Sequence, residues 1–269
     1  MSDVLVDVQG LVRHFGLRGG DEVVRAVDDV SFTIRPGETF GLLGESGSGK
    51  STVARLLLRL DRPTAGRVEF DGRDLTALSR GELRRLRPHM QIVFQDPFAA
   101  LNRRKTVEHS IGLPLAVHTK LSRRQRATRV RELLELVGLR PEFATRYPHE
   151  MSGGQSQRVS IARALALDPS FVILDEAVSA VDVSIQAQIL NLLRDLQQRL
   201  GLTYLFISHD LAIVRYMSDR VGVMQQGRLV ECGTREELFG SPQHEYTRAL
   251  MAAVPVPDPR RERARAATA

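Results

Sequence analysis

A glycine-rich run near the N-terminal end of the chain has residue types and spacing that could bind phosphate. It reads Gly44-Glu45-Ser46-Gly47-Ser48-Gly49-Lys50-Ser51-Thr52. The run matches G-x-x-x-x-G-K-[ST], and glycines at these positions let successive backbone N–H groups point at phosphate oxygens. Lys50 would place a positive charge on the β- and γ-phosphates, and the Ser51 hydroxyl can bind Mg²⁺. The run therefore predicts a binding site for a nucleoside triphosphate.

Two adjacent carboxylates could supply the matching acid–base chemistry. Asp175 and Glu176 follow the apolar run Phe171–Leu174 directly. Open α/β sheets place their ligands at the carboxyl ends of strands, so this is a position where a metal and a water molecule can be held. Asp175 can hold Mg²⁺ through water, and Glu176 is then free to orient or deprotonate an attacking water. The alternative is a pair of acids stabilising a helix N-terminus, but the upstream glycine-rich run favours catalysis.

A second glycine-containing segment is also suited to an anion. Ser152-Gly153-Gly154-Gln155 stands where we expect a helix over Gln155–Leu165 to begin. A serine N-cap with free backbone N–H groups behind it attracts negative charge. Taken by itself, the segment is equally an ordinary helix cap.

These residues need a parallel sheet to bring them together. Short apolar strands are expected at Thr39–Leu43, Phe171–Leu174 and Tyr204–Ile207, and continuous apolar strands suit a sheet covered on both faces. Apolar residues at three- and four-residue steps predict a helix over Ile185–Leu200. Further strands are expected at Val4–Val8, Val30–Ile34, Arg67–Phe70, Gln91–Phe94, Val221–Met224 and Arg228–Glu231, and a helix over Ser51–Leu60.

The middle of the chain has a different pattern. Between about residues 96 and 158 the sequence predicts helices and almost no strand. Ser122 followed by Gln125 has the form of a capping box, and an apolar stripe then runs to Gly138. The pattern indicates a helical insert between α/β segments.

Composition excludes several classes of protein. The 269 residues include one cysteine, Cys232, which excludes a disulfide framework and a four-cysteine metal site. No apolar run approaches the length of a membrane span, and the N-terminus lacks the features of a secretory signal. The net charge is +6, but the arginine-rich stretches lack the interleaved aromatic residues that bind single strands. We therefore expect no nucleic-acid partner.

The order of these motifs resembles that of the ATP-binding subunit of ABC transporters. Gln95 resembles the family's glutamine that touches Mg²⁺, and His209 the histidine that contacts the γ-phosphate. Asp182 lies in a segment similar to the loop that crosses between two subunits, and Phe15 stands where an aromatic ring stacks on adenine. The resemblance implies an α/β fold with a P-loop NTPase core, an antiparallel β N-terminal part and an inserted α-helical subdomain. The ATPase domain would span residues 1–257, with the insert at about 96–158, and residues 258–269 are expected to form a disordered tail.

The resemblance also implies an activity and partners. Two ATPase subunits, in a homo- or heterodimer, would enclose ATP and Mg²⁺ beneath transmembrane permease subunits, at the cytoplasmic face of the membrane. Glu176, His209 and Lys50 would be catalytic, and Ser51, Gln95 and Asp175 would place Mg²⁺. ATP would be bound by Phe15, Gln95 and Gly44 to Thr52, and the partner's ATP would be contacted by Ser152, Gly153, Gly154, Gln155 and Asp182. The family's usual Pro and Thr after the acid pair are Ala177 and Val178 here, which loosens the expected turn.

The C-terminal segment narrows the resemblance. Pro242-Gln243-His244-Glu245-Tyr246-Thr247 is similar to the tail of oligopeptide and dipeptide importer ATPases, which work with an extracytoplasmic substrate-binding protein. Nickel importers and the ATPases of soluble phosphonate-cleaving assemblies share this tail and remain alternatives. A nucleic-acid-linked ABC protein would need long coiled-coil inserts or a second ATPase half. A non-hydrolysing subunit is disfavoured because Glu176 and His209 are both present.

Overall fold

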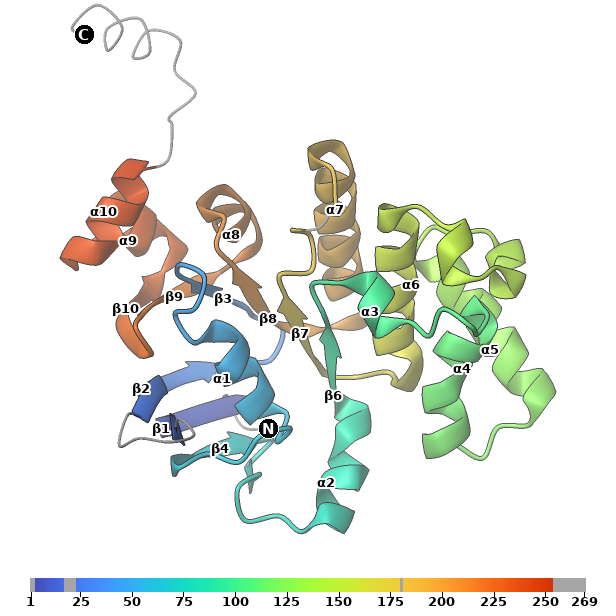
Figure 1. Ribbon diagram of the computed structural model, residues 1–269, viewed down its shortest axis with the longest axis horizontal. Coiled ribbons are helices and arrows are strands. Elements are labelled where there is room, and N and C mark those ends of the chain that lie inside the picture. Colours follow the sequence, from blue (N-terminus) through green and yellow to red (C-terminus); the bar gives the residue numbers. More distant parts are fainter. Residues whose placement is uncertain (1–2, 17–22, 180, 254–269) are drawn as a thin grey trace, which may run out of the picture.

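A computed structural model describes residues 3–16, 23–179 and 181–253. The first of its two sheets is antiparallel and lies at the N-terminal end of the chain (Figure 1). Its strand order is β2-β1-β4-β5. The strands are β1 (Val6–Gly16), β2 (Val23–Ile34), β4 (Ala65–Phe70) and β5 (Arg73–Asp74). Together they form the antiparallel β N-terminal part expected from the sequence.

The second sheet has six strands in the order β10-β9-β3-β8-β7-β6. Neighbouring strands from β9 to β6 run parallel, and β10 pairs with β9 in the antiparallel direction. The strands are β3 (Thr39–Leu43), β6 (Met90–Val93), β7 (Phe171–Asp175), β8 (Thr203–Ser208), β9 (Arg220–Gln225) and β10 (Arg228–Thr234). Every residue of β3 and β8 is buried, as expected for a sheet covered on both faces.

Four α-helices lie between β6 and β7 in the sequence and group at one side of the molecule, on the right in Figure 1. They are α3 (Pro97–Ala100), α4 (Val107–His118), α5 (Arg123–Leu136) and α6 (Gly153–Ala164). The capping box of Ser122 and Gln125 begins α5, and Val130, Leu133 and Leu134 are fully buried. The predicted fold class, including the inserted helical part, is confirmed.

The remaining helices follow strands of the two sheets. They are α1 (Lys50–Leu57), α2 (Arg80–Leu86), α7 (Val183–Leu200), α8 (Leu211–Met217), α9 (Arg235–Gly240) and α10 (Glu245–Ala253). One apolar core joins α1 and the antiparallel sheet to one face of the parallel sheet, and a second joins α4–α7 to its opposite face. In the described ranges, no helix combines the length and apolarity needed to cross a bilayer.

The structure differs from the sequence prediction at several element boundaries. β1 and β2 are much longer than the predicted Val4–Val8 and Val30–Ile34, and their pairing continues through register shifts between Val8 and His14. Helix α1 ends at Leu57, three residues before the predicted end, where Arg59 adopts a left-handed φ of 50°. The tail over residues 258–269, predicted to be disordered, lies outside the described residues.

Candidate functional site

The glycine-rich loop joins β3 to α1 and is held in place by two distant strands. Gly49 has a φ of 105°, and a Cβ atom there would lie 2.1 Å from the carbonyl oxygen of Ala26 in β2. A Cβ atom on Gly44 would lie 2.3 Å from the carbonyl oxygen of Met224 in β9. These backbone atoms cannot move aside as the end of a flexible side chain can. Larger residues at these two positions would therefore push the loop away from β2 and β9.

Lys50 turns its ammonium group into this loop. Its Nζ donates to the carbonyl oxygens of Gly44 at 2.7 Å and Glu45 at 2.6 Å. Burial lowers the pKa of Lys50, and the negative charges of Glu176, Asp175 and Glu45 partly oppose that shift. A buried ammonium surrounded by oxygen atoms is a site that attracts an anionic ligand.

Ser51 and Asp175 meet beside Lys50. The Ser51 hydroxyl donates to Oδ1 of Asp175 at 3.0 Å. Burial raises the pKa of Asp175, and the charge of Glu176 adds to this, against the Ser51 hydrogen bond and the charge of Lys50. A hydroxyl and a carboxylate are hard oxygen ligands, and Mg²⁺ is commonly held by one or two such groups together with substrate phosphates. The side chains present therefore fit Mg²⁺.

Glu176 and His209 complete the cluster. Oε1 of Glu176 lies 3.2 Å from Nδ1 of His209, which follows β8. Glu176 has a φ of 49°, in the left-handed region, and its N–H donates to the carbonyl oxygen of Ile207 at 3.0 Å. Such a conformation costs on the order of 1 kcal/mol or more for a residue with a side chain and is often found at functional sites. Here it turns the carboxylate away from the strand direction and toward the histidine.

The burial of the Asp175 carboxylate is expected to lower the stability of the nucleotide-free chain. We expect Asp175→Asn to raise the melting temperature of the nucleotide-free chain by about 2–4 °C, because a neutral amide removes the burial penalty. The folded-state pKa is raised, so the native chain binds the proton more readily than the unfolded chain, and its stability falls as the pH rises. The gain should therefore be largest near neutral pH and shrink as the pH falls toward the pKa of Asp175. Thermal melts from pH 4 to pH 8 measure it, and a lower melting temperature at pH 7 would contradict the assignment.

The other predicted ATP residues lie in different relations to this cluster. Gln95 is exposed and follows β6, which pairs in parallel with β7, so it lies at the same sheet edge as Asp175. Phe15 lies in β1, and the guanidinium of Arg13 stacks over its ring with the central carbon 4.4 Å from the ring centre. The stacking of adenine on Phe15 stays a prediction.

The segment Ser152–Gln155 begins α6, which Figure 1 shows well separated from α1. Its Ser152 and Gln155 side chains hydrogen-bond within the segment as a capping box. A Cβ atom on Gly154 would lie 2.5 Å from Cγ2 of Ile185, so this glycine has a packing role in addition to any ligand role. Asp182 is exposed at the start of α7. The structure therefore does not bring these residues to the chain's own Lys50.

The turn after the acid pair is better packed than its sequence indicated. Ala177 and Val178 are both 2% exposed and belong to the apolar core. The Val178 carbonyl accepts a hydrogen bond from the Gln186 side chain at 2.8 Å, and the Ser179 hydroxyl donates to the Glu176 carbonyl at 2.9 Å. The expected loosening of this turn stays a prediction, and the structure adds that its two apolar side chains are packed into the core.

One contact to the glycine-rich loop was not anticipated. The N–H of Glu45 donates to the hydroxyl oxygen of Tyr246, which lies in α10. The two residues are 201 positions apart. No local pattern in the sequence marks such a pair, because it depends on how the C-terminal helix folds back onto the core.

Comparison with known proteins agrees with this geometry. A family model described as ABC transporter matches residues 27–179, and one described as the oligopeptide/dipeptide transporter C-terminal region matches residues 230–269. A probable peptide ABC transporter ATP-binding protein of Sinorhizobium fredii is 56% identical over 98% of this chain and 76% of its own length. A glutathione import ATP-binding protein of Salmonella paratyphi A is 54% identical over 98% of this chain, which spans 43% of that relative.

Solved structures are similar as well. The dimeric ATP-binding cassette MJ0796 bound to ADP and Pi has a TM-score of 0.78 and 31% identity, over 86% of this chain and 99% of its own. A cbiO1 structure from Clostridium perfringens has the same TM-score and identity, over 94% and 97%. The matched family model covers the glycine-rich loop and the acid pair together. The chain belongs to the ABC transporter family, as an ATP-binding cassette.

Proposed function

We propose that this chain hydrolyses ATP with Mg²⁺ and, as one half of a dimer, powers peptide uptake through a membrane permease. The observation that carries the proposal is the cluster of Lys50, Ser51, Asp175, Glu176 and His209, assembled from two strand ends and one helix start. The 56% identity to a probable peptide transporter subunit supports the choice of cargo class. The proposed ATPase domain spans residues 1–257, with the helical subdomain at about 96–158.

The side chains divide the chemistry between them. Glu176 would accept a proton from the attacking water, and His209 at 3.2 Å would orient that carboxylate and face the γ-phosphate. Lys50 would stabilise the negative charge that spreads over the transferred phosphoryl group. Ser51, Asp175 and Gln95 would hold Mg²⁺, which neutralises charge on the β- and γ-phosphates when bound. In the dimer, Ser152–Gln155 and Asp182 would contact the ATP of the partner subunit.

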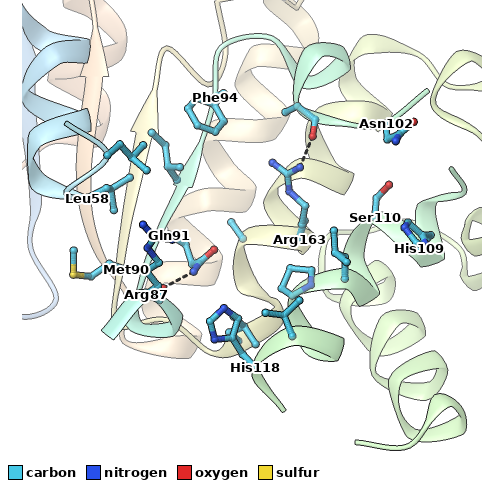
Figure 2. Close-up of a pocket in the computed structure, with 18 residues that line it drawn as sticks. Leu58, Arg87, Met90, Gln91, Phe94, Asn102, His109, Ser110, His118 and Arg163 are labelled. Atoms are coloured by element: carbon cyan, nitrogen blue, oxygen red, sulfur yellow. Dashed lines mark hydrogen bonds between the residues drawn. The ribbon is translucent and has the colours of Figure 1, made fainter. Parts of the chain in front are cut away.

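A groove that Phe94 lines, next to Gln95 in the sequence, is suited to a short permease helix. It has a volume of about 550 Å³ and lies between the end of α1, β6, α4 and α6 (Figure 2). Four large apolar side chains that line it are 37–52% exposed, namely Leu60, Phe94, Leu113 and Val117. Phe94 directly precedes Gln95, so an occupant of the groove would lie next to a proposed Mg²⁺ residue. Exposed apolar surface of this kind is typical of a binding site for another protein.

Arg163 lines the groove and links two of the helices that form it. Its guanidinium donates to the carbonyl oxygen of Ala100 in α3, as Figure 2 shows, and burial lowers its pKa. This contact joins α6 to α3, the short helix that follows Gln95. A helix that docks in the groove would therefore press on both the proposed Mg²⁺ residue and the helix that carries the partner-facing Ser152.

The proposal is tested by co-purification. We propose that the chain binds its permease at the cytoplasmic face of the membrane. A tagged Glu176→Gln chain, incubated with ATP and Mg²⁺, is therefore expected to co-purify with multi-span permease subunits from detergent-solubilised cells. Leu113→Glu should abolish the co-purification, because it buries a charge in the apolar groove. Leu200→Glu is the matched control, since Leu200 is similarly exposed but lies at the end of α7. Recovery of soluble enzyme subunits without a membrane protein would overturn the transport assignment and leave the ATPase assignment standing.

A further inference from the structure

The segment before α10 is fastened to the parallel sheet through one carboxylate. Glu231 in β10 accepts hydrogen bonds from the backbone N–H groups of Gln243 at 2.7 Å and His244 at 3.1 Å. Burial would raise the pKa of Glu231, but the backbone amides of Gln243 and His244 and the charge of the nearby His244 outweigh it and lower the pKa. Glu231 therefore stays ionised and keeps the start of α10 in a fixed place.

Tyr246 extends from that fixed start toward the glycine-rich loop. Its own N–H donates to Nδ1 of His244 at 3.2 Å, and its hydroxyl oxygen accepts the N–H of Glu45 at 3.4 Å. Burial raises the pKa of the Tyr246 hydroxyl, so it remains a neutral phenol at ordinary pH.

The peptide unit that Tyr246 contacts is the same one that holds Lys50. The N–H of Glu45 and the C=O of Gly44 belong to one planar group, and in a trans peptide they point in opposite directions. Gly44 O accepts the Lys50 ammonium at 2.7 Å. One rigid plane therefore connects the tyrosine hydroxyl on one side to the lysine ammonium on the other. Hydrogen bonds arranged in such a chain polarise one another.

We propose that Tyr246 is a positioning residue for nucleotide binding, which acts on Lys50 through the Gly44–Glu45 peptide. The C-terminal helix then contributes to the ATP site of its own chain, although it carries none of the nucleotide motifs. This inference rests on the proposed function, because it takes Lys50 to contact the phosphates of ATP.

The test is the affinity for ATP with Mg²⁺, measured by equilibrium titration of the full chain. Tyr246→Phe keeps the ring and removes the hydroxyl, and we expect Kd and KM for ATP to rise about three- to tenfold, as for the loss of one hydrogen bond. The kcat value should stay at the wild-type value. The melting temperature of the nucleotide-free chain should fall by no more than about 2–4 °C, as for the loss of one internal hydrogen bond. Tyr216→Phe is the matched control, because that hydroxyl bonds to Asn191, away from the loop. An unchanged Kd in Tyr246→Phe, or an equal rise in Tyr216→Phe, would overturn the inference.

A double substitution separates positioning from general stabilisation. If Tyr246 acts through Lys50, adding Tyr246→Phe to Lys50→Ala should weaken ATP binding no further. An additional rise of the same size as in the wild-type background would show that the hydroxyl acts independently of Lys50 and would sink the inference. Normal ATP binding by Lys50→Ala alone would instead contradict the proposed function itself.

Discussion

Glu176→Gln is expected to lower ATP hydrolysis by about 10²- to 10⁴-fold, the usual contribution of a positioned general base. The amide keeps the size and the oxygen of the carboxylate but cannot accept the proton of water. ATP binding should survive, since the phosphates are held by the loop from Gly44 to Thr52 and by Lys50, none of which the substitution touches. The altered chain should therefore accumulate as an ATP-bound dimer.

Two measurements check this expectation together. Phosphate release gives the loss of turnover, and size-exclusion chromatography with ATP and Mg²⁺ gives the fraction of dimer. Glu142→Gln is a matched control, because it removes an exposed carboxylate of the helical part and should change neither quantity. A Glu176→Gln chain with full activity would remove Glu176 from the mechanism and leave His209 as the base to be tested.

Lys50→Ala is expected to weaken ATP binding by about 10- to 100-fold, the range for a lost hydrogen bond to a charged group. The loss has two physical sources. The phosphates lose a positive charge held in a buried place, and Asp175 and Glu176 lose the cation that offsets their own repulsion of an anion. Titration with ATP measures the effect, and Lys120→Ala, an exposed lysine outside the loop, is the control. Equal affinities for the two variants would contradict the placement of phosphate beside Lys50.

Local patterns were sufficient for the elements that carry the chemistry. The glycines at 44 and 49 and the apolar run before Asp175 have short-range physical causes, namely a tight turn and a strand buried on both faces. For that reason a parallel α/β sheet with a helical insert could be predicted from the residues, and Ser51 and Asp175 could be expected to meet. The antiparallel N-terminal part was implied by the family resemblance. The roles of Glu176, His209 and Gln95 in catalysis stay predictions.

Features that depend on distant packing could not be predicted. The left-handed φ of Glu176 is set by a hydrogen bond to Ile207, in a strand that follows it by about 30 positions. The clash that restricts position 154 to glycine comes from Ile185, and the Tyr246 contact comes from the C-terminal helix. In each case the sequence gives the residue but not the residue that it contacts. Contacts between residues far apart in the chain leave no periodic pattern in the sequence.

The central place of β3 in the parallel sheet has a consequence for how the protein is made. β3 lies between β8 and β9, and its first residue, Thr39, pairs with Tyr204. While a ribosome synthesises the chain, the glycine-rich loop leaves it long before β8 and β9, the two strands that flank β3. At about 5–20 residues per second the interval is on the order of ten seconds or more. The antiparallel pairing of β1 with β2 and β4 closes over shorter distances and can form first. A chain that ends before residues near 225 therefore lacks β9, the strand that pairs with β3 and lies against Gly44 of the glycine-rich loop.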